Sequence, residues 1–305
     1  MQRVKLHKSL PVWLRSWAAF IVAVAMLLLV WAGGWLLVAR FAPAGLTYFT
    51  VGSFGALILG AVMLILNEPI VVWSMGAKWI RRREDNPKLW DAVKRATPWH
   101  LWPGPRIYVL PSRGMNAISF GWGIRGLSAV GATQGIIREL NDDELASVMA
   151  HEVGHILNKD ILVSMIMTIM VMMMAFTGWL LLRLGPYSSS SRSSSKRSNG
   201  ATALLVIILV GFAFYGFGRL LGMILQMFVS RQREYAADAK GSRIMGSSRP
   251  LASALRKISG NPSMGNRTAN AAFGFLCTAD PDESDLMATH PNMRKRLAAL
   301  EWLEE

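Results

Sequence analysis

The sequence predicts a mainly α-helical integral membrane protein, in which four transmembrane helices form two hairpins and a cytosolic α+β domain carries a small β-sheet. Three observations indicate this class. Of the 305 residues, 52% are hydrophobic and 17% are charged, whereas soluble domains carry about 25% charged residues. Four long runs contain no charged residue, and a segment with a β-like pattern separates the second run from the third. The single cysteine, Cys277, excludes a disulfide framework and any metal site built on several thiolates.

The four uncharged runs cover residues 17–39, 46–67, 161–182 and 198–218. A helix that crosses a bilayer needs about 20 apolar residues, so each run is long enough. The hydrophobic core of a signal peptide has only about 7–15 residues, so we expect the first run to be retained as an anchor. A buried core helix is the alternative for any one run, but four such runs in one chain favour a membrane protein.

The basic residues set the expected orientation, because cytoplasmic loops carry an excess of lysine and arginine. Such residues crowd the N-terminal tail and the segment after the second run, which places the N terminus and residues 68–160 in the cytoplasm. The serine-rich loop 188–198 also carries basic residues, against this orientation, but the early spans usually dominate. The net charge of +14 lies mostly beside the apolar runs, so we expect membrane lipids as partners and no nucleic acid.

These features divide the chain into four parts. Residues 1–67 form the N-terminal tail and the first hairpin, and residues 68–160 form a cytosolic part with the sheet. Residues 161–218 form the second hairpin around the serine-rich loop, and residues 219–305 form a cytosolic part with C-terminal helices. The last of these helices, residues 293–303, is amphipathic, with three basic residues beside leucines, and its expected role is core packing.

The cytosolic segment between the hairpins has short β-like runs at residues 106–110, 115–122 and 127–133, bounded by proline and glycine. A helix is expected before them, at about residues 87–96. After them, Asn141 to Glu144 fits a capping box. In this motif the side chain of the first residue accepts a hydrogen bond from the backbone N–H of the fourth, and the side chain of the fourth accepts one from the backbone N–H of the first. This box predicts the start of an amphipathic helix.

That helix contains His151-Glu152-Val153-Gly154-His155. Two histidines four positions apart lie on one helix face, about 6 Å apart along the axis, so both imidazoles can reach one ion. Zinc suits them, because it binds imidazole nitrogen in a tetrahedral site. Glu152 can accept the proton of a water on that ion, whose pKa zinc lowers to about 7.

A catalytic zinc usually has a third protein ligand, and the best candidate is Glu234. Asp238 lies four positions later, so on a helix it can face the same point, and we assign it to a bond that orients an imidazole. Asp160 competes for that role. Two spans separate His155 from Glu234, so both halves of the site return to the same side of the membrane. The alternative is that Glu234 pairs with neighbouring arginines at a charged helix end.

These residues resemble those of the membrane-bound zinc metalloprotease family, which includes bacterial heat-shock proteases and the CAAX prenyl endopeptidases; the bacterial heat-shock members are the more similar. The resemblance covers residues 115–117, 140–160, 233–238, 289–291 and 294–296, together with the order of spans and cytosolic parts.

The resemblance implies a zincin-like catalytic domain and a zinc metalloendopeptidase of the gluzincin type in the bacterial cytoplasmic membrane. It implies an active site on the cytoplasmic side that degrades damaged, misfolded or unfolded membrane proteins, in protein quality control and the stress response. His151, His155 and Glu234 are then the zinc ligands, and Glu152 is the catalytic base. The sequence after Asn116 departs from the pattern, with Ile-Ser where Phe-Ala is expected.

In the mechanism expected from these residues, an extended peptide pairs with an edge strand that includes Asn116, Ala117 and Ile118. The developing oxyanion needs a further donor. His290 and Tyr235 are both candidates for that donor. A surface position or a fourth metal ligand is an equally good interpretation of His290.

Other functions remain open alternatives. An intramembrane protease would hold its motif within an apolar run, but polar residues flank this one. A CAAX-type processing protease would use a larger chamber than four helices enclose. A regulatory processing protease or a non-catalytic scaffold with a retained metal site is also possible, and a transporter would carry ionisable groups within its spans. The sequence predicts no oligomeric state.

Overall fold

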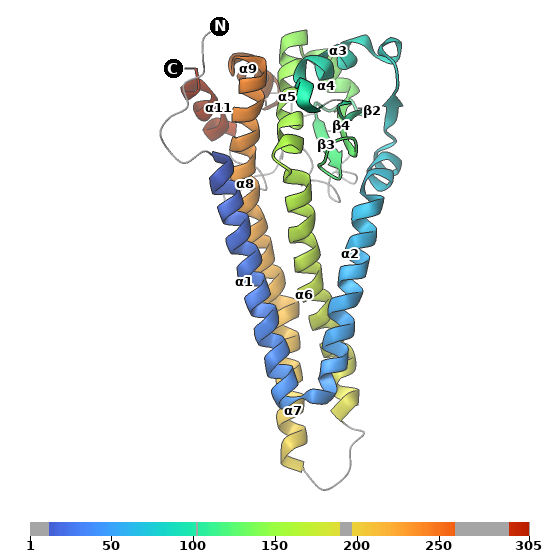
Figure 1. Ribbon diagram of the computed structural model, residues 1–305, viewed down its shortest axis with the longest axis vertical. Coiled ribbons are helices and arrows are strands. Elements are labelled where there is room, and N and C mark those ends of the chain that lie inside the picture. Colours follow the sequence, from blue (N-terminus) through green and yellow to red (C-terminus); the bar gives the residue numbers. More distant parts are fainter. Residues whose placement is uncertain (1–11, 102, 190–196, 260–292, 305) are drawn as a thin grey trace. The chain divides into compact units, whose positions relative to one another are not determined.

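A computed structural model describes residues 12–101, 103–189, 197–259 and 293–304 (Figure 1). The chain forms two compact units. The sheet unit comprises residues 1–17, 65–163 and 229–305, and the helical unit comprises residues 18–64 and 164–228. Several long helices contribute residues to both units.

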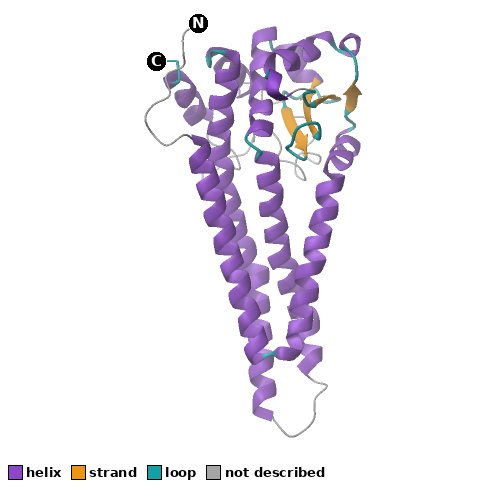
Figure 2. Cartoon of the chain, viewed as in Figure 1, coloured by secondary structure: helices purple, strands orange, loops and turns teal. Residues whose placement is uncertain are grey.

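The helical unit is built from parts of five helices. They are α1 (Val12–Phe41), α2 (Leu46–Met75), α6 (Asp160–Ser189), α7 (Arg197–Phe212) and α8 (Gly218–Met245), and a π-helical turn, Ala213–Phe217, joins the last two. Within the predicted serine-rich loop, residues 188–198, α6 continues to Ser189 and α7 begins at Arg197; residues 190–196 lie outside the described residues. Figure 2 shows how much of the described chain is helical.

Three of these helices are long and apolar enough to cross a membrane: Phe20–Phe41, Pro43–Met75 and Asp160–Leu184. The fourth predicted span, residues 198–218, contains a shorter apolar helix in the described chain, Ala201–Gly216. Large apolar side chains such as Leu29 and Phe54 are exposed on the helical unit, at 72% and 62%. Outward-facing apolar surface of this kind suits a lipid environment. The fold is thus mostly helical with three candidate membrane helices.

Small residues and a short series of hydrogen-bonded side chains join helices of the helical unit. The Trp31 indole donates to the Ser53 hydroxyl at 3.0 Å, and Ser53 is 3.1 Å from the Thr177 hydroxyl. A Cβ on Gly52 would lie 2.9 Å from the Thr177 backbone, so only glycine permits this approach of α2 to α6. Small residues and hydroxyl bonds are the usual means of helix packing in membranes.

The sheet unit contains a four-stranded sheet with the order β1-β2-β4-β3. The strands are β1 (Lys78–Ile80), β2 (Arg106–Leu110), β3 (Ala117–Gly121) and β4 (Ser128–Thr133). β2 and β4 are parallel, and the other pairs are antiparallel. The three predicted strands and the helix α3 (Pro87–Ala96) are confirmed, whereas β1 was not predicted.

The sheet packs against the central helix α5 (Asp142–Leu157). The predicted capping box is confirmed: Asn141 Oδ1 accepts from the Glu144 N–H, and the Glu144 carboxylate accepts from the Asn141 N–H, both at 2.9 Å. α5 is buried over most of its length, because β3 and β4, α3 and α9 (Arg249–Ser259) all contact it (Figure 1). α4 (Gln134–Glu139) leads into it, and α11 (Met293–Trp302) packs on α9.

Two polar residues near the end of α2 attach this helix to the sheet. Asn67 Oδ1 accepts from the Gly121 N–H at 2.8 Å, and the Glu68 carboxylate accepts from the Tyr108 hydroxyl at 2.8 Å and pairs with Arg106. Burial and the Glu68 carboxylate raise the pKa of Tyr108 to about 12, so the phenol remains a donor at neutral pH. Gly121 has φ of +93°, a conformation that a side chain would strain.

Candidate metal centre

Three potential metal ligands from two helices meet in the interior of the sheet unit. His151 and His155 lie on one face of α5, and Glu234 lies on α8. The two imidazole Nε2 atoms are 3.1 Å apart. Glu234 Oε2 is 3.5 Å from His151 Nε2, and Glu234 Oε1 is 3.5 Å from His155 Nε2. One ligand atom from each residue lies within 4.8 Å of the others.

These separations fit a tetrahedral ion. Ligand atoms held at about 2.0–2.1 Å from zinc, at tetrahedral angles, are about 3.3 Å from one another. The two imidazole nitrogens, 3.1 Å apart, are close to this value, and each has a different oxygen of Glu234 at 3.5 Å. Two imidazoles and one carboxylate are also a donor set that zinc takes in catalytic sites, which keep a fourth position open.

Each imidazole is oriented by its own carboxylate. His151 Nδ1 lies 2.8 Å from Asp238 Oδ1, and His155 Nδ1 lies 2.8 Å from Asp160 Oδ2. An N–H on each Nδ1 leaves the lone pair of each Nε2 directed at the common point. Asp238 and Asp160 therefore each contact a different histidine, whereas the sequence offered them as alternatives for one position.

Two glycines permit α5 and α8 to approach closely enough for the site to form. A Cβ on Gly154 would lie 3.1 Å from the Ala237 carbonyl oxygen. A Cβ on Gly241 would lie 2.9 Å from the His151 backbone nitrogen. The glycine inside the motif of α5 thus has a packing reason, because α8 could not place Glu234 beside the histidines at a wider separation.

Two buried arginines lie at the site, and the sequence did not predict these contacts of theirs. Arg296 of α11 donates to both carboxylate oxygens of Asp238, at 3.0 and 2.7 Å, and lies 3.3 Å from Glu234 Oε2. Arg233 donates to the Asp160 carbonyl at 2.6 Å. The helix at 293–303 packs in the core as expected, and the contacts of Arg296 with the site are an additional feature that was not predicted. The basic run 294–296, which is part of the family resemblance, was the sequence feature that could have indicated the role of Arg296.

The charges of the site leave room for a divalent cation. Among the described residues, four buried carboxylates and two buried guanidiniums surround the two imidazoles, so negative groups outnumber positive ones at the site. Buried charges are normally paired or bound to metals. The six groups are Glu152, Asp160, Glu234, Asp238, Arg233 and Arg296.

The pKa shifts of the buried groups agree with this arrangement of charges. Burial alone would lower the pKa of His151, but hydrogen bonds to Asp238 and Glu234 outweigh it and raise the pKa to about 10. For Asp238, burial is opposed by Arg296 and His151, and its pKa is lowered. Arg296 has a raised pKa, because Asp238 and Glu234 outweigh the effect of burial. The same carboxylates that favour a proton on His151 would favour a metal cation.

The other predicted residues have different surroundings. Glu152 is buried between the two histidines of α5, and Tyr235 is partly buried next to Glu234 on α8. His290 lies outside the described residues. Asn116 directly precedes β3, where its side chain accepts from the Ala117 N–H at 2.9 Å. Ala117 and Ile118 belong to β3, which is at the edge of the described sheet and has five buried residues.

Comparisons with known proteins agree with this geometry. Residues 85–304 match peptidase family M48. A protease HtpX homolog from Leuconostoc citreum is 30% identical over 82% of this chain and 86% of its own length. A protease HtpX homolog from Bifidobacterium longum is 34% identical over 77% of this chain and 76% of its own length.

The fold is also similar to a solved structure. The crystal structure of S. mikatae Ste24p matches with a TM-score of 0.51 and 18% sequence identity. The match covers 94% of this chain and 66% of the Ste24p chain, so this chain spans just under two thirds of that protein. At this level of identity, the similarity concerns the fold.

Proposed function

Because this chain belongs to peptidase family M48, we propose that His151, His155 and Glu234 bind one zinc ion and that this site hydrolyses peptide bonds as a gluzincin-type endopeptidase. The family and the protease HtpX homologues identify the chain as a membrane metalloprotease that acts on peptides. The observation that carries the finer proposal is the donor set, two imidazoles and a carboxylate at the separations of a tetrahedral site.

Zinc bound here would polarise the scissile carbonyl and acidify the attacking water. Glu152, a buried residue that follows His151 on α5, takes the proton from that water and delivers it to the nitrogen of the leaving amine. Asp238 and Asp160 hold their imidazoles in the tautomer that leaves Nε2 free. Arg296 keeps Asp238 ionised and in place through two hydrogen bonds. Tyr235 and His290 are the candidates for stabilising the oxyanion.

We further propose that an extended peptide pairs with β3, at Asn116, Ala117 and Ile118. Two observations support this strand: it has one neighbour among the described strands, and it packs against the helix α5 that carries the histidines.

The proposed topology has four spans in two hairpins, with residues 198–218 as the fourth. The four-part division at residues 67, 160 and 218 is part of this proposal. The distribution of basic residues supports a cytoplasmic site, and the family resemblance of the sequence suggests the bacterial inner membrane as the location and damaged or misfolded membrane proteins as substrates.

The proposal is tested with the purified full-length chain and its Glu152→Gln variant. Wild type is expected to hold one zinc per chain by elemental analysis and to cleave casein, and a chelator should abolish cleavage. Glu152→Gln should hold the same zinc and cleave at least about 100-fold more slowly, because a general base contributes about 10²–10⁴-fold. Glu139→Gln, an exposed carboxylate on α4, is the matched control. Normal cleavage by Glu152→Gln would disprove its role, and wild type without zinc would disprove the site.

A further inference from the structure

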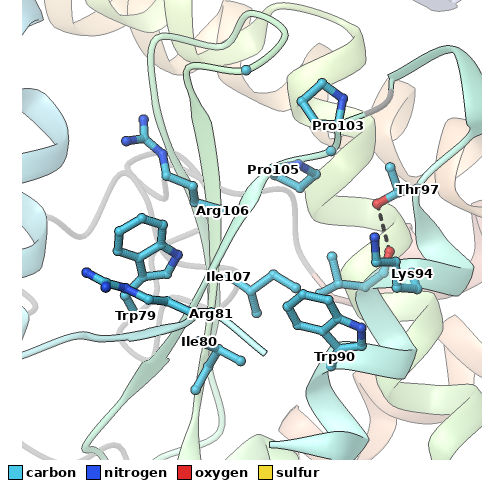
Figure 3. Close-up of a pocket in the computed structure, with 13 residues that line it drawn as sticks. Trp79, Ile80, Arg81, Trp90, Lys94, Thr97, Pro103, Pro105, Arg106 and Ile107 are labelled. Carbon is cyan, nitrogen blue, oxygen red and sulfur yellow. Dashed lines mark hydrogen bonds between the residues drawn. The ribbon is translucent and has the colours of Figure 1, made fainter. Parts of the chain in front are cut away.

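A second site lies on the opposite edge of the sheet from β3, where β1 and β2 face α3 (Figure 3). It is a cavity of about 370 Å³ within the sheet unit, a size typical of small-molecule sites. Its floor is apolar and buried, formed by Ile80, Val93 and Ile107. None of the residues that bind the metal in the proposed function lines it.

The walls of this pocket combine indoles with cations. The guanidinium of Arg81 lies 4.4 Å from the ring centroid of Trp79, and the ammonium of Lys94 lies 5.3 Å from that of Trp90. Figure 3 shows the two pairs on different walls of the pocket. A cation held over an aromatic ring is positioned without losing its charge, whereas a carboxylate partner would neutralise it.

The described lining residues include three basic side chains and no acidic one. The third, Arg106, is paired with Glu68, whereas Arg81 and Lys94 lie over the two indoles and add positive charge to the walls. The pocket therefore fits a molecule with an anionic group at its mouth and an apolar part on its floor. A free inorganic anion would leave the apolar floor unused.

The position of the pocket in the chain indicates the source of such a molecule. β1 begins three residues after the candidate span Pro43–Met75. At 1.5 Å per residue, these 33 residues extend about 50 Å, slightly more than the 40–45 Å of a bilayer with its headgroups. Trp73, at the end of this span, is 86% exposed, as is typical of an indole at the membrane interface.

From these observations we propose that the pocket binds an anionic phospholipid, with the phosphate on Arg81 and Lys94 and the adjoining glycerol and acyl carbons against Trp79 and Trp90. Basic pockets next to membrane helices bind anionic headgroups in this way. The bound lipid would attach the α3 side of the sheet unit to the membrane surface. This inference does not depend on the metal site.

The test uses native mass spectrometry of the purified full-length chain in a neutral maltoside detergent, titrated with dioleoyl phosphatidylglycerol. We expect wild type to retain one tightly bound phosphatidylglycerol and to retain dioleoyl phosphatidylcholine much more weakly. Each of Arg81→Gln and Lys94→Gln should weaken binding about fivefold, and the double variant about 25-fold. Both side chains are exposed, so thermal unfolding should be unchanged.

Two controls separate charge from folding. Arg138→Gln removes an exposed basic residue of α4, outside the pocket, and should bind phosphatidylglycerol as wild type does. The charge-conserving Arg81→Lys and Lys94→Arg should retain binding within about twofold. A Trp90→Ala variant should weaken phosphatidylglycerol binding, because it removes part of the wall that contacts the acyl carbons.

Three results would overturn the proposal. The first is a double variant that is folded and binds phosphatidylglycerol as wild type does. The second is full displacement of the lipid by inorganic phosphate at the same concentration, which would indicate a simple anion site. The third is displacement by a soluble glutamate-rich peptide at the lipid's own concentration, which would indicate a peptide groove.

Discussion

Arg296 and Asp238 form a bidentate ion pair in the interior of the protein, with side-chain exposures of 1% and 2%. The guanidinium Nε and Nη2 donate to the two carboxylate oxygens at 3.0 and 2.7 Å. Asp238 in turn contacts the Nδ1 atom of His151. Helix α11 therefore reaches the proposed metal site through Asp238, which lies between Arg296 and an imidazole, and also directly, because Arg296 Nη1 lies 3.3 Å from Glu234 Oε2.

Replacing Arg296 should affect both stability and metal affinity. Arg296→Ala leaves the Asp238 carboxylate buried without its partner, and breaking a buried pair in this way costs about 3–5 kcal/mol. We expect a markedly lower unfolding temperature and weaker zinc binding, measured by thermal unfolding and by zinc titration with a chelator as competitor. Arg296→Lys keeps the charge but loses the second hydrogen bond, so it should lie between wild type and alanine. Lys295→Ala, an exposed change on α11, should match wild type, and an equally stable Arg296→Ala would contradict the pairing.

The two orienting aspartates should contribute separately to metal binding. Asp238→Asn and Asp160→Asn each remove the carboxylate that holds one imidazole, and such changes usually weaken metal binding about 10–100-fold. Because each aspartate serves a different histidine, both single variants should be affected. A shared role would instead leave one of them at wild-type affinity. Zinc affinity measured by chelator competition, with Asp143→Asn at an exposed site of α5 as control, distinguishes the two cases.

Local patterns explain what the sequence could predict. His151 and His155 share a helix face because of their spacing, and Asn141 and Glu144 are three positions apart in one capping box, so neither inference needs the rest of the fold. Glu234 was predicted as a ligand because a catalytic zinc usually has a third protein ligand and because two spans return the chain to the same side of the membrane. These arguments work because helix geometry is the same in every protein.

Other features depend on distant contacts that no local pattern contains. β1 has three residues, two of them exposed, and exists because it pairs with β2. Arg296 is 58 positions from Asp238, and its neighbours look like the solvated basic face of an amphipathic helix. Of the four predicted spans, residues 198–218 contain only a shorter apolar helix, Ala201–Gly216, among the described residues.

The close approach of α5 and α8 predicts that Gly241 cannot carry a side chain. A Cβ there would lie 2.9 Å from the backbone nitrogen of His151, so Gly241→Ala must push the helices apart. Overpacking of this kind costs about 1–3 kcal/mol, and the shift would move Glu234 from the histidines. Thermal unfolding and zinc affinity should both fall. Gly33→Ala, where nothing lies within 4 Å of the added Cβ, should have neither effect, and a wild-type zinc affinity in Gly241→Ala would contradict the close packing.

The pH dependence of stability should contain a contribution from Glu144, which joins the start of α5 to α9. Burial alone would raise the pKa of this carboxyl, but bonds from Lys257, the Asn141 N–H and Ser253 outweigh burial and lower it. A carboxyl whose pKa is lower in the folded state stabilises the fold above its unfolded pKa of about 4.3, and this stabilisation is lost as the pH falls through the folded value. Glu144→Gln should therefore unfold at a lower temperature than wild type at pH 7, and the difference should shrink below about pH 4. Glu139→Gln, at an exposed position, should show no such difference. If the difference in unfolding temperature between Glu144→Gln and wild type stays constant from pH 7 to pH 3, packing rather than the charge of Glu144 connects the two helices.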